Sequence, residues 1–204
     1  MTAGETEALI EQDRALRAEA DALLARHGIL GILREFGRPH ISGSYALQLM
    51  TWRDLDIYLE MPALSGVEGS EVRVDRFLEL GRRLATAIGP RKASFTDHLH
   101  FPATENVPGL YWGIHTDILS RGGWKIDVWG VTADTCAQLL RRAESIAVSV
   151  NAETRAAILS IKNEVCRHPR YRDTITSQHI YDAVLSSGVR TLDEFWRHIG
   201  DRRD

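Results

Sequence analysis

The chain has 204 residues, with 25 Lys and Arg residues against 28 Asp and Glu residues and a formal net charge of -3. Hydrophobic residues make up 44% of it, which is typical of a globular protein with a buried core. Proteins dedicated to nucleic-acid binding usually carry a basic excess, so this balance argues against that class, although it does not exclude a local basic groove.

The sequence also predicts a cytoplasmic protein. Cys136 and Cys166 lie far apart and form no CxxC pair, which is typical of reduced thiols rather than of a disulfide framework. The first twenty residues carry charges throughout and lack the apolar segment of a signal peptide. Because no apolar run approaches the length that spans a bilayer, we expect no membrane segment.

Hydrophobic periodicity predicts alternating helices and strands in the first part of the chain. Helices are expected over 5–27, 29–36, 43–50 and 72–88. Strands are expected over 40–42, 54–60, 93–101, 110–119 and 124–131, with Pro39 as a break before the first of them and a hairpin turn at 120–123.

After Thr132 the pattern becomes helical throughout, over 133–147, 153–166, 177–186 and 192–199. Thr191 and Glu194 form a capping-box pattern at the start of the last helix. We therefore predict an α+β protein with a mixed-sheet core flanked by helices over residues 1–131, followed by a C-terminal helical bundle over residues 132–204.

Two carboxylates stand out in the strand expected over 54–60. Asp54 and Asp56 are two positions apart, so their side chains point to the same face. Adjacent carboxylates repel each other, and a cation is expected between them. Mg²⁺ prefers oxygen ligands of this kind.

A phosphate site is predicted just upstream, where Gly43 and Ser44 begin a short helix. A helix start offers unpaired backbone N–H groups, glycine lets the backbone approach a ligand, and the serine hydroxyl adds a donor. Asp127 lies in a later strand flanked by apolar residues and would complete a two-metal site if it faced the same side.

These residues resemble the motif of the nucleotidyltransferase superfamily that shares its catalytic fold with DNA polymerase β. The motif stands here as Ile41–Ser44, nine residues, Asp54–Ile57, and then Asp127, and the resemblance covers residues 38–131. Segments 180–185 and 188–190 look, less specifically, like the C-terminal region of small bacterial antibiotic nucleotidyltransferases.

The resemblance implies a role for each matching residue. Gly43 and Ser44 would bind the nucleotide phosphates, and the catalytic residues Asp54, Asp56 and Asp127 would hold two Mg²⁺ ions, with Mn²⁺ as a substitute. Asp127 is also a candidate general base toward the acceptor. Two further nucleotide-binding candidates are Arg53, as a phosphate or structural partner, and Lys162, for which a solvated lysine is the alternative.

The reaction implied is transfer of AMP from ATP to a hydroxyl group of a small acceptor such as an antibiotic, with release of pyrophosphate. The slightly acidic chain suits a cationic small molecule better than a nucleic acid. Two alternatives stay open: a protein-modifying nucleotidyltransferase of a toxin–antitoxin pair, and a non-catalytic nucleotide-binding module of the same fold. A homodimer also stays open.

Three histidines offer zinc ligands. His98 and His100 share one face of the strand expected over 93–101, and His115 lies on the next strand. No fourth ligand follows at a telling distance, so ordinary satisfied or exposed histidines are the preferred interpretation.

Overall fold

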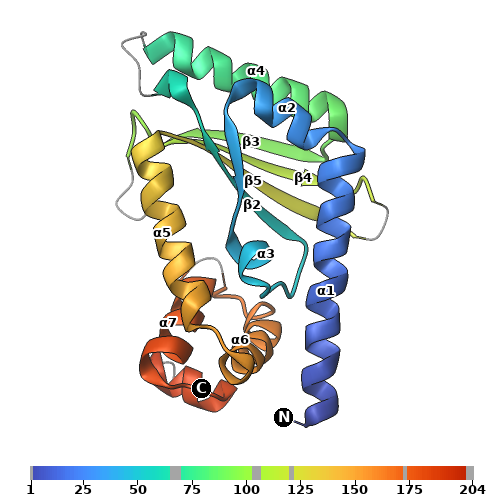
Figure 1. Cartoon of the computed structure of the whole chain (residues 1–204), viewed down its shortest axis with the longest axis vertical. Coiled ribbons are helices and arrows are strands. Elements are labelled where there is room, and N and C mark those ends of the chain that lie inside the picture. Colours follow the sequence, from blue (N-terminus) through green and yellow to red (C-terminus); the bar gives the residue numbers. More distant parts are fainter. Residues whose placement is uncertain (1, 65–69, 103–106, 120–121, 172–173, 201–204) are drawn as a thin grey trace.

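The computed structural model describes residues 2–64, 70–102, 107–119, 122–171 and 174–200 (Figure 1). Its centre is a five-stranded sheet in the order β1-β2-β5-β4-β3. The strands are β1 (Arg38–Ile41), β2 (Asp54–Glu60), β3 (Lys92–Asp97), β4 (Leu110–Thr116) and β5 (Trp124–Val131). The central strands β2 and β5 run parallel, and all other neighbours are antiparallel.

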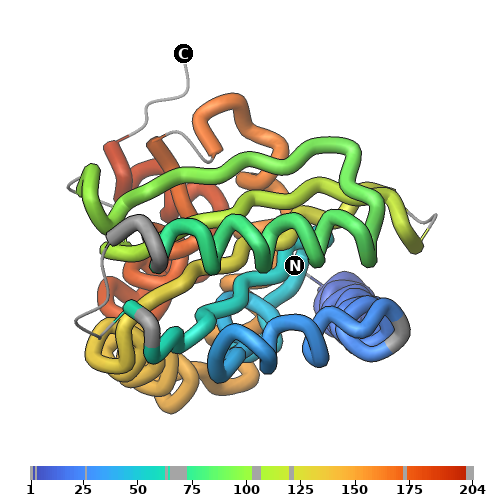
Figure 2. The backbone as a smooth tube through the Cα atoms, turned by 90° about the horizontal axis from the view of Figure 1, so that it is seen from above, coloured from blue at the N-terminus to red at the C-terminus, as the bar shows by residue number. Residues whose placement is uncertain are grey.

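Three helices cover one face of the sheet: α1 (Ala3–Arg26), α2 (Ile29–Phe36) and α4 (Ser70–Ile88). Seen from above, α4 lies across the sheet and α1 is viewed nearly end-on (Figure 2). Side chains alternate along β2, so that Leu55, Ile57 and Leu59 point into this core with none of their surface exposed. The polar residues between them therefore point to the other face.

The remaining helices lie toward that other face and below it: α3 (Gly43–Leu47), α5 (Ala133–Ser149), α6 (Ala152–Val165), α7 (Ser177–Ser187) and α8 (Leu192–His198). Figure 1 shows α5 running along one side of the sheet from the end of β5 toward α6 and α7. A second hydrophobic cluster holds α6, α7 and α8 together and also takes in Leu47 and Leu49. Leu9 and Ile10 of α1 pack against it, so α1 contacts both halves of the molecule.

The α+β class with a mixed sheet is confirmed, and so is the capping box, because Thr191 accepts a hydrogen bond from the backbone N–H of Glu194 and the Glu194 carboxylate accepts one from that of Thr191. The division at residues 131 and 132 stays a prediction. No helix in the described part of the chain is both long and apolar enough to cross a membrane. Ser120 and Arg121 of the expected hairpin turn lie outside the described residues.

Several element boundaries differ from the prediction, and three of these differences have a clear local reason. Pro39 lies inside β1 rather than before it, which is tolerated because β1 is an edge strand. Strand β3 ends at Asp97, whose carboxylate accepts hydrogen bonds from the N–H groups of Leu99 and His100 and turns the chain. Helix α3 ends at Leu47 because Gln48 adopts a left-handed conformation with φ 58°.

Candidate active site

The three predicted aspartates lie on one face of the two central strands. Asp56 of β2 and Asp127 of β5 are direct register partners in the parallel pair, and Asp54 is two residues before Asp56. Register partners point to the same side of a sheet, so Asp127 shares the face of the other two. The sequence predicted a three-carboxylate site only if Asp127 faced the same side as Asp54 and Asp56. The structure shows that it does.

A cation lies between these carboxylates, and it comes from the protein. The ammonium group of Lys125 donates a short hydrogen bond to Asp127 Oδ2 and lies 3.6 Å from Asp54 Oδ1. Although burial by itself lowers its pKa, the two carboxylates outweigh this effect and raise the pKa of Lys125. The cation expected between Asp54 and Asp56 is thus a lysine of the chain, which the sequence motif does not include.

Of the three aspartates, Asp56 has the most strongly shifted pKa. Burial, reinforced by repulsion from Asp54 and Asp127, raises the pKa of Asp56 to about 7. Burial also raises the pKa of Asp127 despite the adjacent ammonium of Lys125. The positive charge of the polypeptide therefore compensates these buried carboxylates only in part.

Gly43 contacts the Asp56 carboxylate with its backbone. A Cβ atom on Gly43 would lie 2.0 Å from Asp56 Oδ2 and 2.8 Å from its Cγ, and φ at Gly43 is +58°. Glycine is needed here both for the close approach and for the left-handed conformation. Ser44, the second residue of α3, is half-buried beside it. The first turn of α3 and the acidic face of β2 are thus adjacent, as the motif predicts.

Two aromatic residues also hold the carboxylates. The hydroxyl of Tyr111 on β4 donates a hydrogen bond of 2.8 Å to Asp127 Oδ1, and the indole of Trp52 donates one of 3.2 Å to Asp54 Oδ2. Sequence analysis assigned neither residue to the site. The contact of Tyr111 depends on the register between β4 and β5, for which the sequence carries no local signal.

Arg53 points away from the carboxylates toward α1. Its guanidinium forms two hydrogen bonds, of 2.7 and 3.0 Å, with the carboxylate of Glu19. This bidentate pair fixes the start of β2 against α1. Of the two roles predicted for Arg53, the structural contact is present, and phosphate binding stays a prediction.

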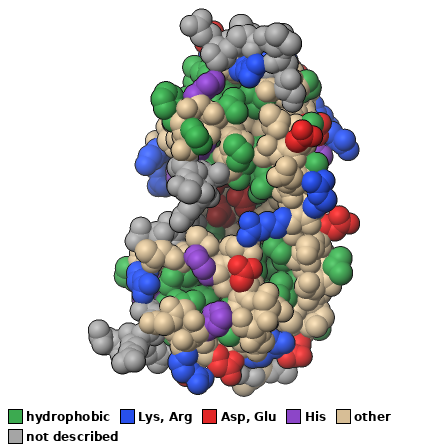
Figure 3. All heavy atoms as spheres, turned by 90° about the vertical axis from the view of Figure 1, so that its left-hand side faces the viewer, with side chains coloured by type: hydrophobic (Ala, Val, Ile, Leu, Met, Phe, Trp, Pro, Cys, Tyr) green, Lys and Arg blue, Asp and Glu red, His purple; other side chains and the backbone are tan. Residues whose placement is uncertain are grey.

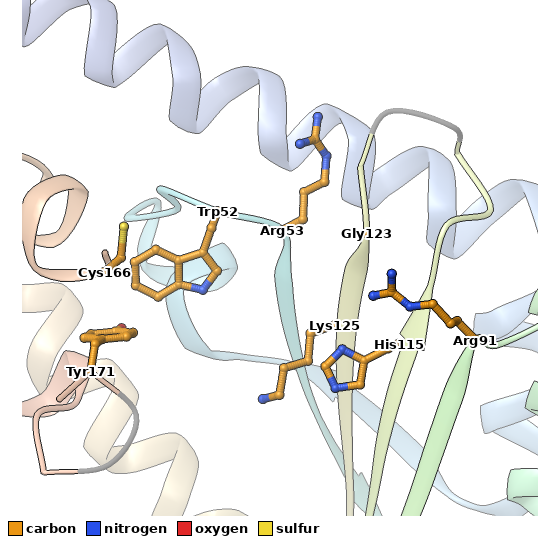
Figure 4. A pocket seen from close by; sticks show the side chains of 8 residues that line it. All are labelled: Trp52, Arg53, Arg91, His115, Gly123, Lys125, Cys166 and Tyr171. Atoms are coloured by element: carbon orange, nitrogen blue, oxygen red, sulfur yellow. The ribbon is translucent and has the colours of Figure 1, made fainter. Parts of the chain in front are cut away.

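Arg53 nevertheless lines a pocket of about 330 Å³ next to the acidic face. Figure 4 shows Trp52, Cys166 and Tyr171 on one side of this pocket. On the other side lie Arg91, His115 and Lys125. Its volume falls in the range of small-molecule and nucleotide sites, and its cationic side chains suit an anion. The pocket lies between the sheet and the helical part of the chain, and residues of both line it.

Lys162 is not a solvated lysine. It is completely buried on α6, where its ammonium donates hydrogen bonds to the backbone carbonyl of Leu49 at 2.7 Å and to the Tyr181 hydroxyl at 3.3 Å. It also lies 4.8 Å from the ring centre of Trp52. Burial lowers the pKa of Lys162 to about 8. The lysine thus joins α6 to the chain before β2, and its contact with a triphosphate stays a prediction.

The molecular surface has a hollow with acidic side chains at its base (Figure 3). Figure 3 shows acidic side chains deep in a hollow between the upper and lower halves of the molecule, with basic side chains at its rim. A negatively charged floor with positive edges can hold a metal ion and the anion that the metal binds.

Comparisons with known proteins support the fold. No family model and no curated protein matches the sequence. The structure is similar to that of a cytoplasmic RNA terminal U-transferase, with a TM-score of 0.56 and 13% identity over 90% of this chain and 55% of that one. Cid1, an RNA terminal uridylyl transferase, gives a TM-score of 0.56 and 15% identity over 90% of this chain and 54% of that one.

Terminal uridylyl transferase 4 from Trypanosoma brucei, solved with bound UTP and UpU, gives a TM-score of 0.52 and 14% identity over 88% of this chain and 57% of that one. The chain thus spans about half the length of these structures. At such identities the likeness shows the fold, which is the nucleotidyltransferase fold with a polymerase β-like core, as the motif predicted. The closer likeness to bacterial antibiotic-modifying members stays a prediction.

Proposed function

We propose that this protein transfers a nucleoside monophosphate from a nucleoside triphosphate to an acceptor hydroxyl group and releases pyrophosphate. The observation that carries the proposal is the convergence of Asp54, Asp56 and Asp127 on one sheet face, against the backbone of Gly43. It occurs in a fold shared with structures described as uridylyl transferases.

The donor set fits Mg²⁺, because it consists of carboxylate oxygens, and burial together with their mutual repulsion raises the pKa of Asp56. Asp54, Asp56 and Asp127 would hold the metal, and the ammonium of Lys125 would have to leave its place between Asp54 and Asp127. When bound, Mg²⁺ would neutralise triphosphate charge and lower the pKa of the acceptor hydroxyl.

The side chains of this chain position the reactants. The acceptor oxygen forms a bond to the α-phosphorus, the bond from that phosphorus to the bridging oxygen breaks, and pyrophosphate leaves with the electron pair. Both oxygens of Asp127, the predicted general base, already accept hydrogen bonds, from Tyr111 and Lys125. Asp127 can therefore receive the hydroxyl proton only after Lys125 has moved. Released Lys125 is suited to pair with a phosphate.

The leading acceptor in our proposal is the 3′ hydroxyl of an RNA. All three structural neighbours are described as acting in terminal uridylyl transfer, two of them explicitly on RNA. Arg91, His115 and Lys125 line the pocket beside the carboxylates and could pair with backbone phosphates. The preference against nucleic acid rested on the net charge of the whole chain, which does not describe this pocket.

A small hydroxylated acceptor is the second candidate. The pocket of about 330 Å³ is large enough for a drug-sized molecule, and its walls include the aromatic rings of Trp52 and Tyr171, whose centres are 5.0 Å apart. The nucleotide is likewise a choice to be tested, since ATP was predicted from the sequence and one neighbour was solved with UTP.

The test incubates purified protein and MgCl₂ with each of the four α-labelled nucleoside triphosphates. Parallel reactions receive an RNA oligonucleotide with a free 3′ hydroxyl, the same RNA with a blocked 3′ end, or a panel of hydroxylated antibiotics. We expect label on the free RNA end, and loss of that label of at least 100-fold in Asp56→Asn. The matched control is Asp182→Asn, which removes an exposed carboxylate on α7 and should keep full activity.

Each result decides between the candidates. Label on antibiotics alone would establish the small-molecule acceptor and refute the RNA proposal. No transfer to any acceptor, together with no Mg²⁺-dependent thermal stabilisation by any nucleotide, would favour the non-catalytic module.

A further inference from the structure

A second group of metal-ligating side chains lies at the other end of β2. His40 is the third residue of β1, Glu60 is the last residue of β2, and Cys136 lies in the first turn of α5. The ring nitrogen, carboxylate oxygen and sulfur that they offer all lie within 4.8 Å of one another. Among the described residues, no other three His, Cys, Asp or Glu side chains bring their ligand atoms within this distance of one another.

Sheet register explains how two of these residues meet. His40 is paired with Tyr58 and Arg38 with Glu60, so His40 and Glu60 are diagonal neighbours on one face. Diagonal neighbours are within reach of long side chains. Helix α5, which starts directly after β5, then places Cys136 against them.

Hydrogen bonding does not account for the cluster. Nε2 of His40 is buried and has no hydrogen-bond partner in the described part of the chain, although it lies 3.4 Å from Glu60 Oε2. Leaving a buried polar atom unpaired is costly, and such an atom in a folded protein calls for an explanation. A cation bound between nitrogen, oxygen and sulfur would supply one.

We propose that His40, Glu60 and Cys136 bind a Zn²⁺ ion. Zn²⁺ is held by imidazole, thiolate and carboxylate groups, whereas Mg²⁺ selects sites made of oxygen alone. Two ligands at about 2.0–2.2 Å from a tetrahedral ion lie about 3.4 Å apart, which matches the separation of His40 Nε2 and Glu60 Oε2. The negative charges of the Cys136 thiolate and the Glu60 carboxylate would balance the two positive charges of the ion, and the thiol proton would be released on binding.

Access and burial fit an ion better than a cysteine nucleophile. The side chain of Cys136 is 1% exposed, so no substrate can reach its sulfur. The Glu60 side chain is 31% exposed and leaves a route for a metal ion and for a water molecule as fourth ligand. Glu60 is separate from the aspartates, because the four residue steps from Asp56 to Glu60 span about 13 Å of strand, whereas His40 is a diagonal neighbour of Asp56 as well as of Glu60.

The ion would fasten the helical part to the sheet. Its three ligands come from β1, β2 and the first turn of α5, the helix that leads from the sheet into the C-terminal helices (Figure 1). A metal bond across these elements stabilises the folded state by mass action and fixes the direction in which α5 leaves the sheet. This role does not depend on the proposed nucleotidyl transfer.

The test uses full-length, metal-free protein titrated with Co²⁺, which replaces Zn²⁺ and reports a bound thiolate by an intense near-ultraviolet absorption band. We expect one equivalent of Co²⁺ to produce this band, one equivalent of Zn²⁺ to abolish it, and Zn²⁺ to raise the thermal unfolding temperature. Cys136→Ser and His40→Gln should lose the band. Cys166→Ser removes the other cysteine, and Asp56→Asn alters the acidic site, so both should keep it.

The wild-type spectrum decides the matter even if a variant folds poorly. Absence of a thiolate band at stoichiometric Co²⁺ in wild-type protein would overturn the proposal, as would a band that persists in Cys136→Ser and disappears in Cys166→Ser. Binding of one equivalent of Co²⁺ without a thiolate band, lost in Asp56→Asn, would assign the metal to the acidic site instead.

Discussion

Replacing Gly43 by alanine tests the contact that joins the first turn of α3 to the acidic face. The new Cβ would lie 2.0 Å from Asp56 Oδ2, well inside a normal contact. The atom in its way belongs to a carboxylate that can turn aside, at a cost of about 1 kcal/mol for an unfavourable rotamer. Holding alanine at φ +58° adds about 1–2 kcal/mol. We expect a loss of about 2–3 kcal/mol in the free energy of unfolding.

The catalytic loss should be larger than the loss of stability, because the carboxylate must move by roughly 1 Å or more, a displacement that can cost about 100-fold in rate. Gly188→Ala is the matched control, since Gly188 has φ +72° and no atom within 4 Å of its Cβ position. It should cost the same conformational penalty of about 1–2 kcal/mol in stability and leave transfer unchanged.

Urea unfolding and Mg²⁺-dependent transfer are measured on Gly43→Ala, Gly188→Ala, Asp56→Ala and the double variant of Gly43 and Asp56. In the Asp56→Ala background the collision is absent, so Gly43→Ala should cost only its conformational part. Folded Gly43→Ala protein with the same activity as Gly188→Ala would refute the assignment of this contact to the active site.

Three further outcomes are expected. Because burial and neighbouring charge raise the pKa of Asp56 to about 7, folded metal-free protein binds a proton that the unfolded chain releases near pH 4. Its stability in EDTA should therefore fall as pH rises from 4 to 7, by up to about 4 kcal/mol, and equal slopes in urea titrations of wild type and Asp56→Asn would contradict this. Lys125→Met removes the cation between Asp54 and Asp127, so it should destabilise metal-free protein by about 1–3 kcal/mol and enlarge its thermal stabilisation by MgCl₂; a smaller Mg²⁺ shift than in wild type would count against competition between lysine and metal. Gly31→Ala, at an exposed position of α2 with nothing within 4 Å of its Cβ position, should raise the free energy of unfolding by about 0.5–1 kcal/mol in the same urea assay, and a loss of stability would show a hidden contact.

The sequence predicted the fold because its local signals agree with the tertiary structure. Alternation along 54–60 placed β2 correctly, since its apolar residues fill the core and its polar residues face the site. The same alternation could have assigned Lys125 to the site, because residues two apart on a strand share a face and Lys125 precedes Asp127 by two.

Other parts of the site carry no local signal. Tyr111 reaches Asp127 only through the register of β4 with β5, and register depends on which residues the whole sheet buries. His40 and Cys136 approach each other although about a hundred residues separate them, because α5 starts where β5 ends. Lys162 shows the same limit: its periodicity indicates a helix, but its burial depends on Leu49 and Tyr181, which come from distant segments.

The three carboxylates of the site explain why a lysine of the chain, Lys125, lies between two of them. Three carboxylates on one sheet face would repel one another strongly if nothing positive lay near them, and Lys125 offsets part of this repulsion in the protein alone. Lys125, even with the more distant Lys162, does not balance three carboxylates, and the pKa of buried Asp56 stays raised. A divalent ion with its triphosphate would bring both the missing positive charge and an anion able to receive Lys125. Displacement of the lysine would then couple metal binding to nucleotide binding, so that Mg²⁺ and nucleotide should stabilise wild-type protein more together than the sum of their separate effects.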